Sequence, residues 1–198
     1  NGVEHPYVPP KTLRIADTLA LHRDWDRDVD PVTYEVVRHN LWQINEEHGA
    51  TIQRLSGSPV AMYALDLNPS ILTEDAEFVY FGPYMQYMSG VTDTQVKWTL
   101  EYRSDNPGIR EGDMFIANDP WVGAAHQQDV MLLCPVFWQG ELFCWVTNCL
   151  HQYDIGGITP GSFCPSAESA YEEGIMLPPL KIIENYEIRR DIEAVYLR

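Results

Sequence analysis

Residues 126–154, HQQDVMLLCPVFWQGELFCWVTNCLHQYD, contain the clearest structural pattern in the sequence. Two apolar runs, 130–138 and 141–150, are rich in β-branched and aromatic residues and are separated by Gln139 and Gly140. Runs of this length and composition favour buried strands, and a two-residue connection that includes glycine favours a tight turn. The stretch therefore predicts an antiparallel β-hairpin.

Each end of this stretch carries a His-x-x-Asp segment, His126 with Asp129 and His151 with Asp154. With strict pairing around a two-residue turn, His151 lies opposite Gln128, and a shift of one residue would place it opposite Asp129. Directly opposed residues in an antiparallel pair lie about 5 Å apart at their Cα atoms. The two segments are thus predicted to converge at the open end of the hairpin.

Strand geometry cannot direct all four of these side chains to one point, because neighbouring residues face opposite sides of a sheet. Residues 119–128 are therefore predicted to form a loop, which Pro120 and Gly123 favour. Imidazole and carboxylate together suit divalent Mn, Fe or Zn, and two histidines with one carboxylate leave positions open for water or substrate. The alternative is structural, with both aspartates capping loops and both histidines bonded to backbone.

A long helix is predicted to begin at Asp30 and Pro31, because Asp suits the N-cap and Pro the first helical turn. Gly57 and Pro59 end the helical pattern. Residues recurring at spacings of three and four predict one buried face: Val37, Leu41, Ile44, His48, Ile52 and Leu55. His48 lies on this stripe and is predicted to be a core histidine rather than a ligand.

Residues 1–29 precede this helix and are predicted to form an extended N-terminal arm, since prolines at positions 6, 9 and 10 oppose regular structure. The charged run 22–28 is predicted to be solvated. Such an arm could wrap a neighbouring subunit or fray as an ordinary terminus.

Shorter patterns predict the remaining elements. They are a strand at 77–81, a helix capped by Thr92 or Asp93, a buried strand at 114–117, a Gly- and Pro-rich loop at 156–165, a short helix at 167–173 and a helix at 188–198. The predicted fold class is α+β, with antiparallel strands packed against the long N-terminal helix, as part of a larger subunit.

The charge, the missing motifs and the cysteine spacing argue against several kinds of function. The net charge of −16 argues against a nucleic-acid-binding surface. The sequence has no phosphate-binding loop, no dinucleotide fingerprint and no G-x-S-x-G motif. Its four cysteines, Cys134, Cys144, Cys149 and Cys164, lack a chelating spacing and are predicted to be reduced thiols, which fits the cytoplasm. No apolar run reaches transmembrane length, and no signal peptide is indicated at 1–10.

The sequence resembles the hydantoinase B/5-oxoprolinase family, and within it the α-type metal-binding subunit of acetone and acetophenone carboxylases. The matching blocks are GDMFIANDP (112–120), HQQDV (126–130), PVFWQGEL (135–142), HQYDIGG (151–157), TPGS (159–162) and EGIMLPP (173–179). With the helix from Asp30, the similarity covers most of residues 30–182. Because family subunits are several hundred residues longer, residues 30–198 are expected to be a fragment, the N-terminal part of a hydantoinase B-like metal-binding domain.

The resemblance implies a divalent metal, Mn or Zn with Fe as a further option, held by His126, Asp129 and His151. It implies that Asp154 supports the metal ligands or is an extra ligand, and Asp154 and Asp119 are the candidate catalytic residues. Asp119 and Glu173 are weaker candidates than Asp154. It also implies a hydantoinase A-like partner subunit that uses ATP, a small third subunit as an option, and no activity of this chain alone.

The reaction implied is ATP-dependent carboxylation, in which a metal-stabilised enolate of acetone or an aryl methyl ketone joins CO2 derived from bicarbonate. The aromatic residues Phe137, Trp138 and Trp145 look more like the ketone carboxylases than the lactam-cleaving members. One alternative is ATP-dependent lactam or hydantoin hydrolysis, of the 5-oxoprolinase or N-methylhydantoinase type. A second is a structural or interaction subunit with a degenerate site, against which the intact histidines and Asp129 count.

Overall fold

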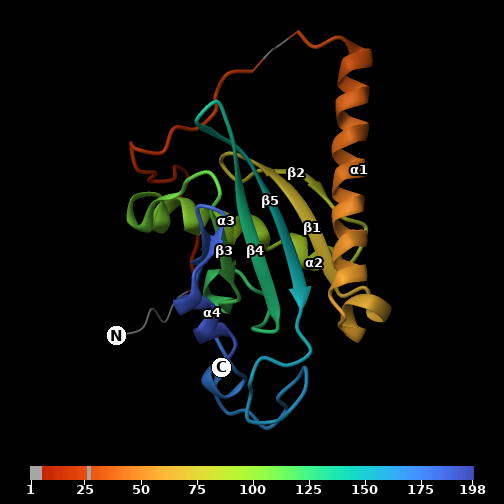
Figure 1. Ribbon diagram of the computed structural model, residues 1–198, viewed down its shortest axis with the longest axis vertical. Helices are drawn as coiled ribbons and strands as arrows, with labels where there is room; N and C mark the ends of the chain where they lie inside the picture. The colour runs from red at the N-terminus through yellow and green to blue at the C-terminus, as the bar shows by residue number, and fades with distance from the viewer. Residues whose placement is uncertain (1–5, 26–27) are drawn as a thin grey trace.

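The computed structural model describes residues 6–25 and 28–198 (Figure 1). Within these residues, seven strands form one antiparallel sheet in the order β2-β1-β5-β4-β3-β6-β7. The strands are β1 (Leu67–Thr73), β2 (Phe78–Phe81), β3 (Met114–Ala117), β4 (Asp129–Trp138), β5 (Glu141–His151), β6 (Leu180–Glu184) and β7 (Glu187–Ile188). The α-helices are α1 (Pro31–Leu55), α2 (Gln86–Ser89), α3 (Thr92–Arg103) and α4 (Arg190–Tyr196). The α+β class predicted from the sequence is confirmed.

Strands β4 and β5 form the predicted hairpin, with Trp138 opposite Glu141. Gln139 and Gly140 have φ values of 52° and 86°, as a tight turn with two left-handed residues requires. Phe143 has no partner on β4, because Phe137 pairs with Leu142 and the next pair is Val136 with Cys144.

This β-bulge shifts the register by one residue toward the open end of the hairpin. His151 consequently pairs with Asp129. The strict register, with His151 opposite Gln128, is wrong, and the shifted register is confirmed. Figure 1 shows the turn and the open end at opposite ends of the long β4–β5 ladder.

Helix α1 begins and ends as its sequence predicts. The Asp30 carboxylate accepts hydrogen bonds from the backbone N–H groups of Val32 and Thr33, both at 3.0 Å. The helix ends at Leu55, just before Gly57. The N-cap carboxylate and the proline that follows it therefore fix the start of the helix, as capping chemistry requires.

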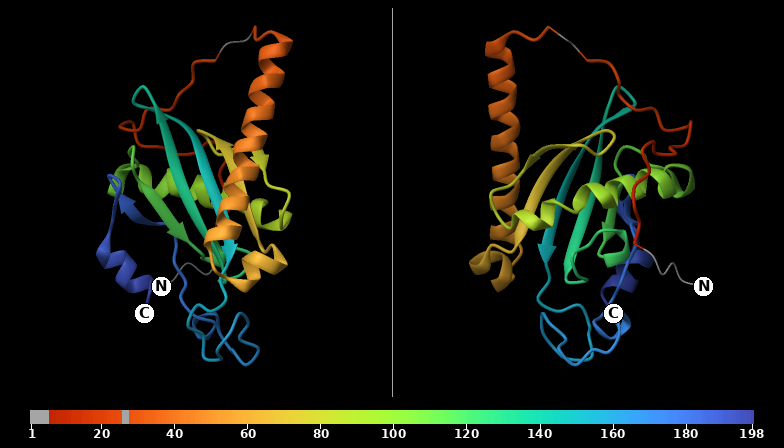
Figure 2. Two further views of the ribbon diagram at one scale, coloured as in Figure 1. Left: turned by 45° about the vertical axis from the view of Figure 1, so that its right-hand side comes forward. Right: turned by 180° about the vertical axis from the view of Figure 1, so that it is seen from behind.

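The predicted buried stripe of α1 is wrong. Val37, Ile44 and Leu55 are 50%, 54% and 79% exposed, and of the helix's own residues Asn45 and Gly49 are the buried ones. The helix is longer than the strands on which it lies, and its N-terminal half extends past them (Figures 1 and 2). Periodicity identified an apolar face but not what covers it.

Helices α2 and α3 cover the face of the sheet opposite to α1 (Figure 2). The main core lies beneath them and includes Leu72, Val96, Leu100, Phe115, Met131, Leu133 and Trp145. The predicted cap of α3 is wrong: the N-cap residue is Val91, without a side-chain hydrogen bond. Thr92 instead donates its hydroxyl to the carbonyl of Met88, and Asp93 pairs with Lys97.

A smaller core lies between the sheet and the C-terminal segment. Ile116, Val130 and Leu177 are buried there, and Ile192 and Tyr196 of α4 pack against them. The helix predicted at 188–198 is thus confirmed at Arg190–Tyr196, whereas strands β6 and β7 were not predicted. The short helix predicted at 167–173 is a single 3-10 turn, η4 (Ala170–Glu172).

The described part of the arm, residues 6–25, packs along the main core. Leu19 is buried, and Leu21 forms an isolated parallel bridge with Leu142. His22 lies within hydrogen-bonding distance of Glu141, at 2.9 Å. The arm is therefore anchored to the sheet, while the predicted charged run 22–28 lies partly outside the described residues, at 26–27. No helix within 6–25 and 28–198 has the length and apolar character needed to cross a membrane.

Candidate metal centre

The open end of the β4–β5 hairpin holds a buried carboxylate next to a buried imidazole. Asp129 is the first residue of β4 and His151 the last residue of β5. Asp129 Oδ1 lies 3.2 Å from His151 Nδ1. The two residues are 0% and 2% exposed, so the pair sits in a medium that opposes uncompensated charge.

His126 joins this pair from the preceding loop. Its Nε2 lies 3.3 Å from Asp129 Oδ2, and its ring centroid lies 5.0 Å from that of His151. One ligand atom from each of the three residues lies within 4.8 Å of the others. The sequence prediction that these three side chains converge is therefore confirmed as geometry.

The side chain of Asn118 anchors the loop that carries His126 by hydrogen bonds. Its side-chain amide donates to the carbonyls of Gln127 at 2.7 Å and Ile175 at 2.8 Å, and its oxygen accepts the backbone N–H of Leu177. Asn118 is almost completely buried. Apart from the 3-10 turn η3 (Pro120–Val122), residues 119–128 form the predicted loop.

The carboxylate of Asp66 lies next to this cluster of three residues, and it was not predicted from the sequence. Its Oδ2 lies 3.6 Å from His151 Nδ1, and its carbonyl accepts the backbone N–H of His151 at 3.1 Å. Burial raises the pKa of Asp66, and the neighbouring His151 acts in the opposite direction. The available signal was an aspartate directly before the apolar residue Leu67, which begins β1.

Each imidazole has one nitrogen facing these carboxylates and the other facing a neutral partner. His126 Nδ1 lies 2.8 Å from the amide oxygen of Gln128. His151 Nε2 contacts the hydroxyl of Ser162. An amide oxygen can only accept, so the proton of a neutral His126 ring lies on Nδ1 and the lone pair of Nε2 faces Asp129.

The residues present fit a divalent cation. Among the described residues, Asp129 Oδ2 and Asp66 Oδ1 are buried oxygens without a hydrogen-bond partner. Unpaired buried carboxylate oxygens are costly, and imidazole lone pairs that face them add repulsion. A cation between these groups would remove both costs, and two imidazoles with carboxylates are the ligand types of Zn, Mn and Fe sites.

The other acidic candidates lie outside this group. Asp119 caps the 3-10 turn η3 by accepting the backbone N–H of Trp121, and burial raises its pKa. Asp154 accepts backbone N–H groups from the loop that follows it, and these hydrogen bonds lower its pKa. Glu173 follows η4 as its C-cap residue. Asp154 therefore caps a loop and Asp119 caps a turn, as the structural alternative predicted for aspartates in this region. His126 and His151 do not follow that alternative, because their rings face carboxylates rather than backbone.

Two aromatic side chains flank the cluster. The ring of Phe163 lies 5.7 Å from that of His151 and 6.1 Å from that of His126, centroid to centroid. Burial, followed by the carboxylates of Asp129 and Asp66, raises the pKa of Tyr87.

The aromatic residues singled out in the sequence lie elsewhere. Trp138 is next to the hairpin turn and 59% exposed, about 30 Å along β4 from Asp129 at roughly 3.3 Å per residue. Trp145 is completely buried in the core. Neither tryptophan therefore contacts the candidate metal centre, and their similarity to the ketone carboxylases rests on the sequence alone.

His48 and the four cysteines are separate from the cluster. His48 is half-buried on α1, and burial lowers its pKa. Cys149 is completely buried, and desolvation raises the pKa of its thiol well above the ordinary value. A protonated thiol is a poor metal ligand, which agrees with the predicted structural role of this cysteine.

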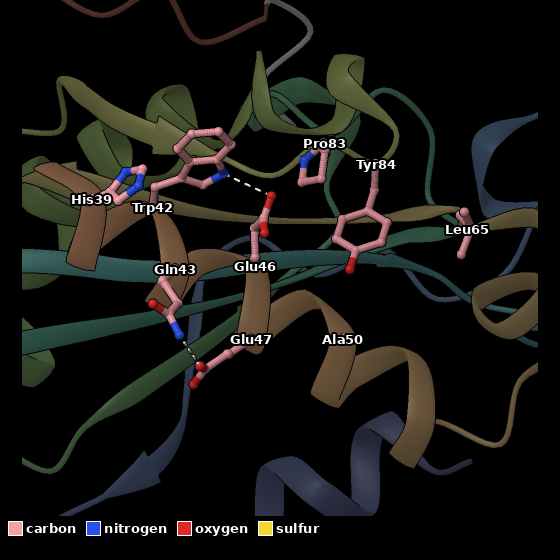
Figure 3. Close-up of a pocket in the computed structure, with 9 residues that line it drawn as sticks. All are labelled: His39, Trp42, Gln43, Glu46, Glu47, Ala50, Leu65, Pro83 and Tyr84. Atoms are coloured by element: carbon pink, nitrogen blue, oxygen red, sulfur yellow. Dashed lines mark hydrogen bonds between the residues drawn. The ribbon is translucent and has the colours of Figure 1, made fainter.

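A groove along α1 shares no residue with the cluster (Figure 3). Its volume is about 730 Å³, and it is lined by His39, Trp42, Gln43, Glu46, Glu47, Ala50, Leu65, Pro83 and Tyr84. Trp42 and Gln43 donate to Glu46 and Glu47, which keeps the polar atoms of this face paired within the helix. A side chain at Gly49 would overlap the ring of Tyr84, so glycine permits this close packing.

Comparison with known proteins places the chain in a family. The model of the hydantoinase B/oxoprolinase family matches residues 30–198. The chain is 30% identical to the acetophenone carboxylase delta subunit of Aromatoleum aromaticum, over 93% of this chain and 27% of that protein. It is 32% identical to the caprolactamase subunit beta of Pseudomonas jessenii, over 83% of this chain and 28% of that protein.

The fold also matches a solved structure. A nucleotide-free acetone carboxylase structure superposes with a TM-score of 0.81 and 23% identity, over 86% of this chain and 22% of that chain. The present chain thus spans less than a third of the length of the relatives it matches. With a family model that covers residues 30–198, the chain belongs to the hydantoinase B/oxoprolinase family.

Proposed function

We propose that His126, Asp129 and His151 bind one divalent metal ion, with Asp66 as a fourth ligand. The observation that carries this proposal is the convergence of three ligand atoms within 4.8 Å, next to carboxylate oxygens that have no hydrogen-bond partner among the described residues. The ligands would be His126 Nε2, His151 Nδ1 and oxygens of the two aspartates. The metal, when bound, would act as a Lewis acid toward a substrate oxygen.

The protein side chains divide the remaining work by their positions. Asp129 is completely buried and forms the floor of the site, whereas the His126 side chain is 29% exposed and marks its open side. Phe163 packs beside both imidazoles, and its ring, although 68% exposed, would shield part of the site from water. A partly dry site strengthens each electrostatic interaction within it and protects reactive intermediates from hydrolysis.

We further propose that the complete protein contributes this centre to an ATP-dependent ketone carboxylase. The support is the similarity to a subunit of acetophenone carboxylase and the shared fold with acetone carboxylase. The reaction would join the methyl carbon of acetone or an aryl methyl ketone to CO2 derived from bicarbonate. A hydantoinase A-like partner subunit would use ATP, since this chain has no phosphate-binding loop.

Lactam hydrolysis is the second candidate, and a specific observation favours it. The chain is as similar to a caprolactamase subunit, at 32% identity, as it is to the carboxylase subunit, at 30%. A Lewis acid at this site could polarise a lactam carbonyl as readily as a ketone oxygen. The two reactions differ in what they require: carboxylation consumes bicarbonate, and ring opening consumes water.

The deciding experiment is an assay of the complete complex with labelled bicarbonate, ATP and either acetone or acetophenone. Carboxylation predicts label in a β-keto acid, and ATP consumption only when both ketone and bicarbonate are present. Parallel reactions contain caprolactam or 5-oxoproline. ATP consumption with a lactam, independent of bicarbonate, would replace the carboxylase proposal with the hydrolase. The Asp129→Asn complex, at matched metal concentration, provides the control for a reaction that does not use this centre.

A further inference from the structure

The loop that follows β5 is held closed by Asp154. One carboxylate oxygen accepts the backbone N–H of Gly156 at 2.9 Å, and the other accepts that of Gly161 at 3.0 Å. Gly161 has a φ of 111°, and a side chain there would meet nothing within 4 Å, so glycine is required for its conformation and not for space. The carboxylate thereby joins the start of the loop to a residue seven positions later.

The residues directly after Gly161 contact the candidate metal ligands. Ser162 places its hydroxyl against His151 Nε2, and Phe163 packs its ring beside the His151 ring. A continuous series of contacts therefore runs from Asp154 through the backbone of Gly161 to Ser162 and on to His151. Asp154 itself is exposed and makes its hydrogen bonds to backbone.

The contact with Ser162 determines which nitrogen of His151 faces the carboxylates. A neutral imidazole carries one N–H and one lone pair. If Nε2 donates to the Ser162 hydroxyl, the lone pair lies on Nδ1, which is 3.2 Å from Asp129 and 3.6 Å from Asp66. His126 is arranged in the same way, with Nδ1 on Gln128. Metal-binding histidines commonly have the second nitrogen fixed by such a partner.

We infer that Ser162, held in place by the Asp154 carboxylate, is the positioning residue that presents His151 Nδ1 to the metal, and that Gln128 does the same for His126 Nε2. This inference rests on the metal centre proposed above. It assigns Asp154 a role at a distance from the metal: the carboxylate fixes the loop, and the loop fixes the imidazole. Asp154 is thus a positioning residue rather than a catalytic one.

The test compares the affinity of the complete, metal-free protein for Zn²⁺ between the wild type and loop variants. We expect Ser162→Ala and Asp154→Ala to weaken Zn²⁺ binding by about 10- to 100-fold, the usual effect of removing a partner of a metal-binding histidine. Ser162→Thr retains the hydroxyl and should restore binding. The control is Ser166→Ala, in the same loop, because its hydroxyl bonds to Thr159 and not to a histidine.

A spectroscopic measurement distinguishes positioning from general destabilisation. In the Zn²⁺-loaded wild type, ¹⁵N NMR of the imidazoles should show His151 coordinated through Nδ1 and protonated at Nε2. In Ser162→Ala we expect a mixture of tautomers at unchanged melting temperature of the metal-free protein. Wild-type affinity in Ser162→Ala, or coordination of wild-type His151 through Nε2, would overturn the inference while leaving the metal centre intact. A wild-type protein that binds no Zn²⁺ would overturn both.

Discussion

The carboxylate of Asp129 faces the imidazole of His151 across the β4–β5 ladder, with Oδ1 3.2 Å from Nδ1. Phe143, the extra residue of the bulge, sets this pairing, because it shifts the register between the turn and the open end of the hairpin. A bulge is a common way to direct a side chain at a functional site. Here it places a carboxylate and an imidazole on the same side of the sheet at the point where both strands end.

The first prediction concerns Asp129→Asn. The amide has the same size but removes the charge that a cation requires, so the protein should lose its stabilisation by Zn²⁺ or Mn²⁺. Metal at 100 times its Kd should stabilise the wild type by about 2.7 kcal/mol, seen as a higher melting temperature. The metal-free variant should be at least as stable as the metal-free wild type, since a buried oxygen without a partner is removed.

The matched control for this variant is Asp119→Asn. Asp119 lies in the same loop region but caps the turn η3. It should therefore keep the full metal-dependent rise in melting temperature. An Asp129→Asn protein that responds to metal as the wild type does would contradict the proposed ligand set.

The hairpin could be predicted from the sequence because its signals are local. Two apolar runs and the pair Gln139–Gly140 specify strands and turn without reference to the rest of the chain. The bulge at Phe143 could not be predicted, since no local pattern in the two runs marks a residue that would be left unpaired. The two registers differ by one residue, and each places the same His-x-x-Asp segments at the same end.

Asp66 and the exposure of α1 depend on contacts between distant parts of the chain. Asp66 reaches the site because β1 pairs with β5. The pair Leu67 and Leu150 is 83 residues apart in sequence, and no local pattern encodes that pairing. The apolar residues of α1 recur with helical spacing, yet Val37 and Ile44 are half exposed, since most of the contacts of α1 are to β1 and its neighbours. Periodicity reports the composition of a face, and the tertiary structure decides its burial.

The second prediction concerns His48 and pH. Burial lowers the pKa of this histidine below its ordinary value of 6.5. Below pH 6.5 the unfolded chain gains a proton that the folded state resists, so the folded state loses stability as pH falls and the loss stops below the folded pKa. Above pH 6.5 the group contributes no pH dependence.

His48→Gln should remove this part of the acid destabilisation and leave metal binding unchanged. The measurement is the melting temperature of both proteins from pH 5 to pH 8, together with their metal content. Identical pH profiles would show that His48 is not desolvated, and loss of metal in a folded His48→Gln protein would show that it is a ligand.

The third prediction concerns the hairpin turn. Gly140 has a φ of 86° and open space around its Cα, so Gly140→Ala introduces backbone strain without a steric clash. The free energy of unfolding should fall by about 1–2 kcal/mol. Gly90→Ala is the matched control, because Gly90 has a φ of −63° and an added Cβ would make only ordinary contact. Urea denaturation that shows equal losses for the two variants would contradict the turn geometry.

The fourth prediction concerns a buried ion pair away from the site. Lys181 Nζ lies 2.7 Å from Asp113 Oδ2, and both side chains are 1% exposed. Lys181→Met leaves the Asp113 carboxylate buried without its counter-charge, so unfolding free energy should fall by about 3–5 kcal/mol. Adding Asp113→Asn should recover part of this loss.

The comparison for this pair is Lys97→Met. Lys97 pairs with Asp93 at 3.0 Å where both side chains are partly exposed. That substitution should cost no more than about 1 kcal/mol. A double variant at Lys181 and Asp113 whose loss equals the sum of the two single losses would show that the two charges do not interact.

The metal centre is tested most directly by anomalous diffraction from crystals of the protein grown with Zn²⁺ or Mn²⁺, recorded on both sides of the metal absorption edge. The account predicts one strong anomalous peak about 2.0–2.3 Å from His126 Nε2, His151 Nδ1 and a carboxylate oxygen of Asp129. After Asp129, the carboxylate nearest to the peak should be that of Asp66. A peak elsewhere on the molecule, or these side chains directed into separate regions with no peak between them, would contradict it.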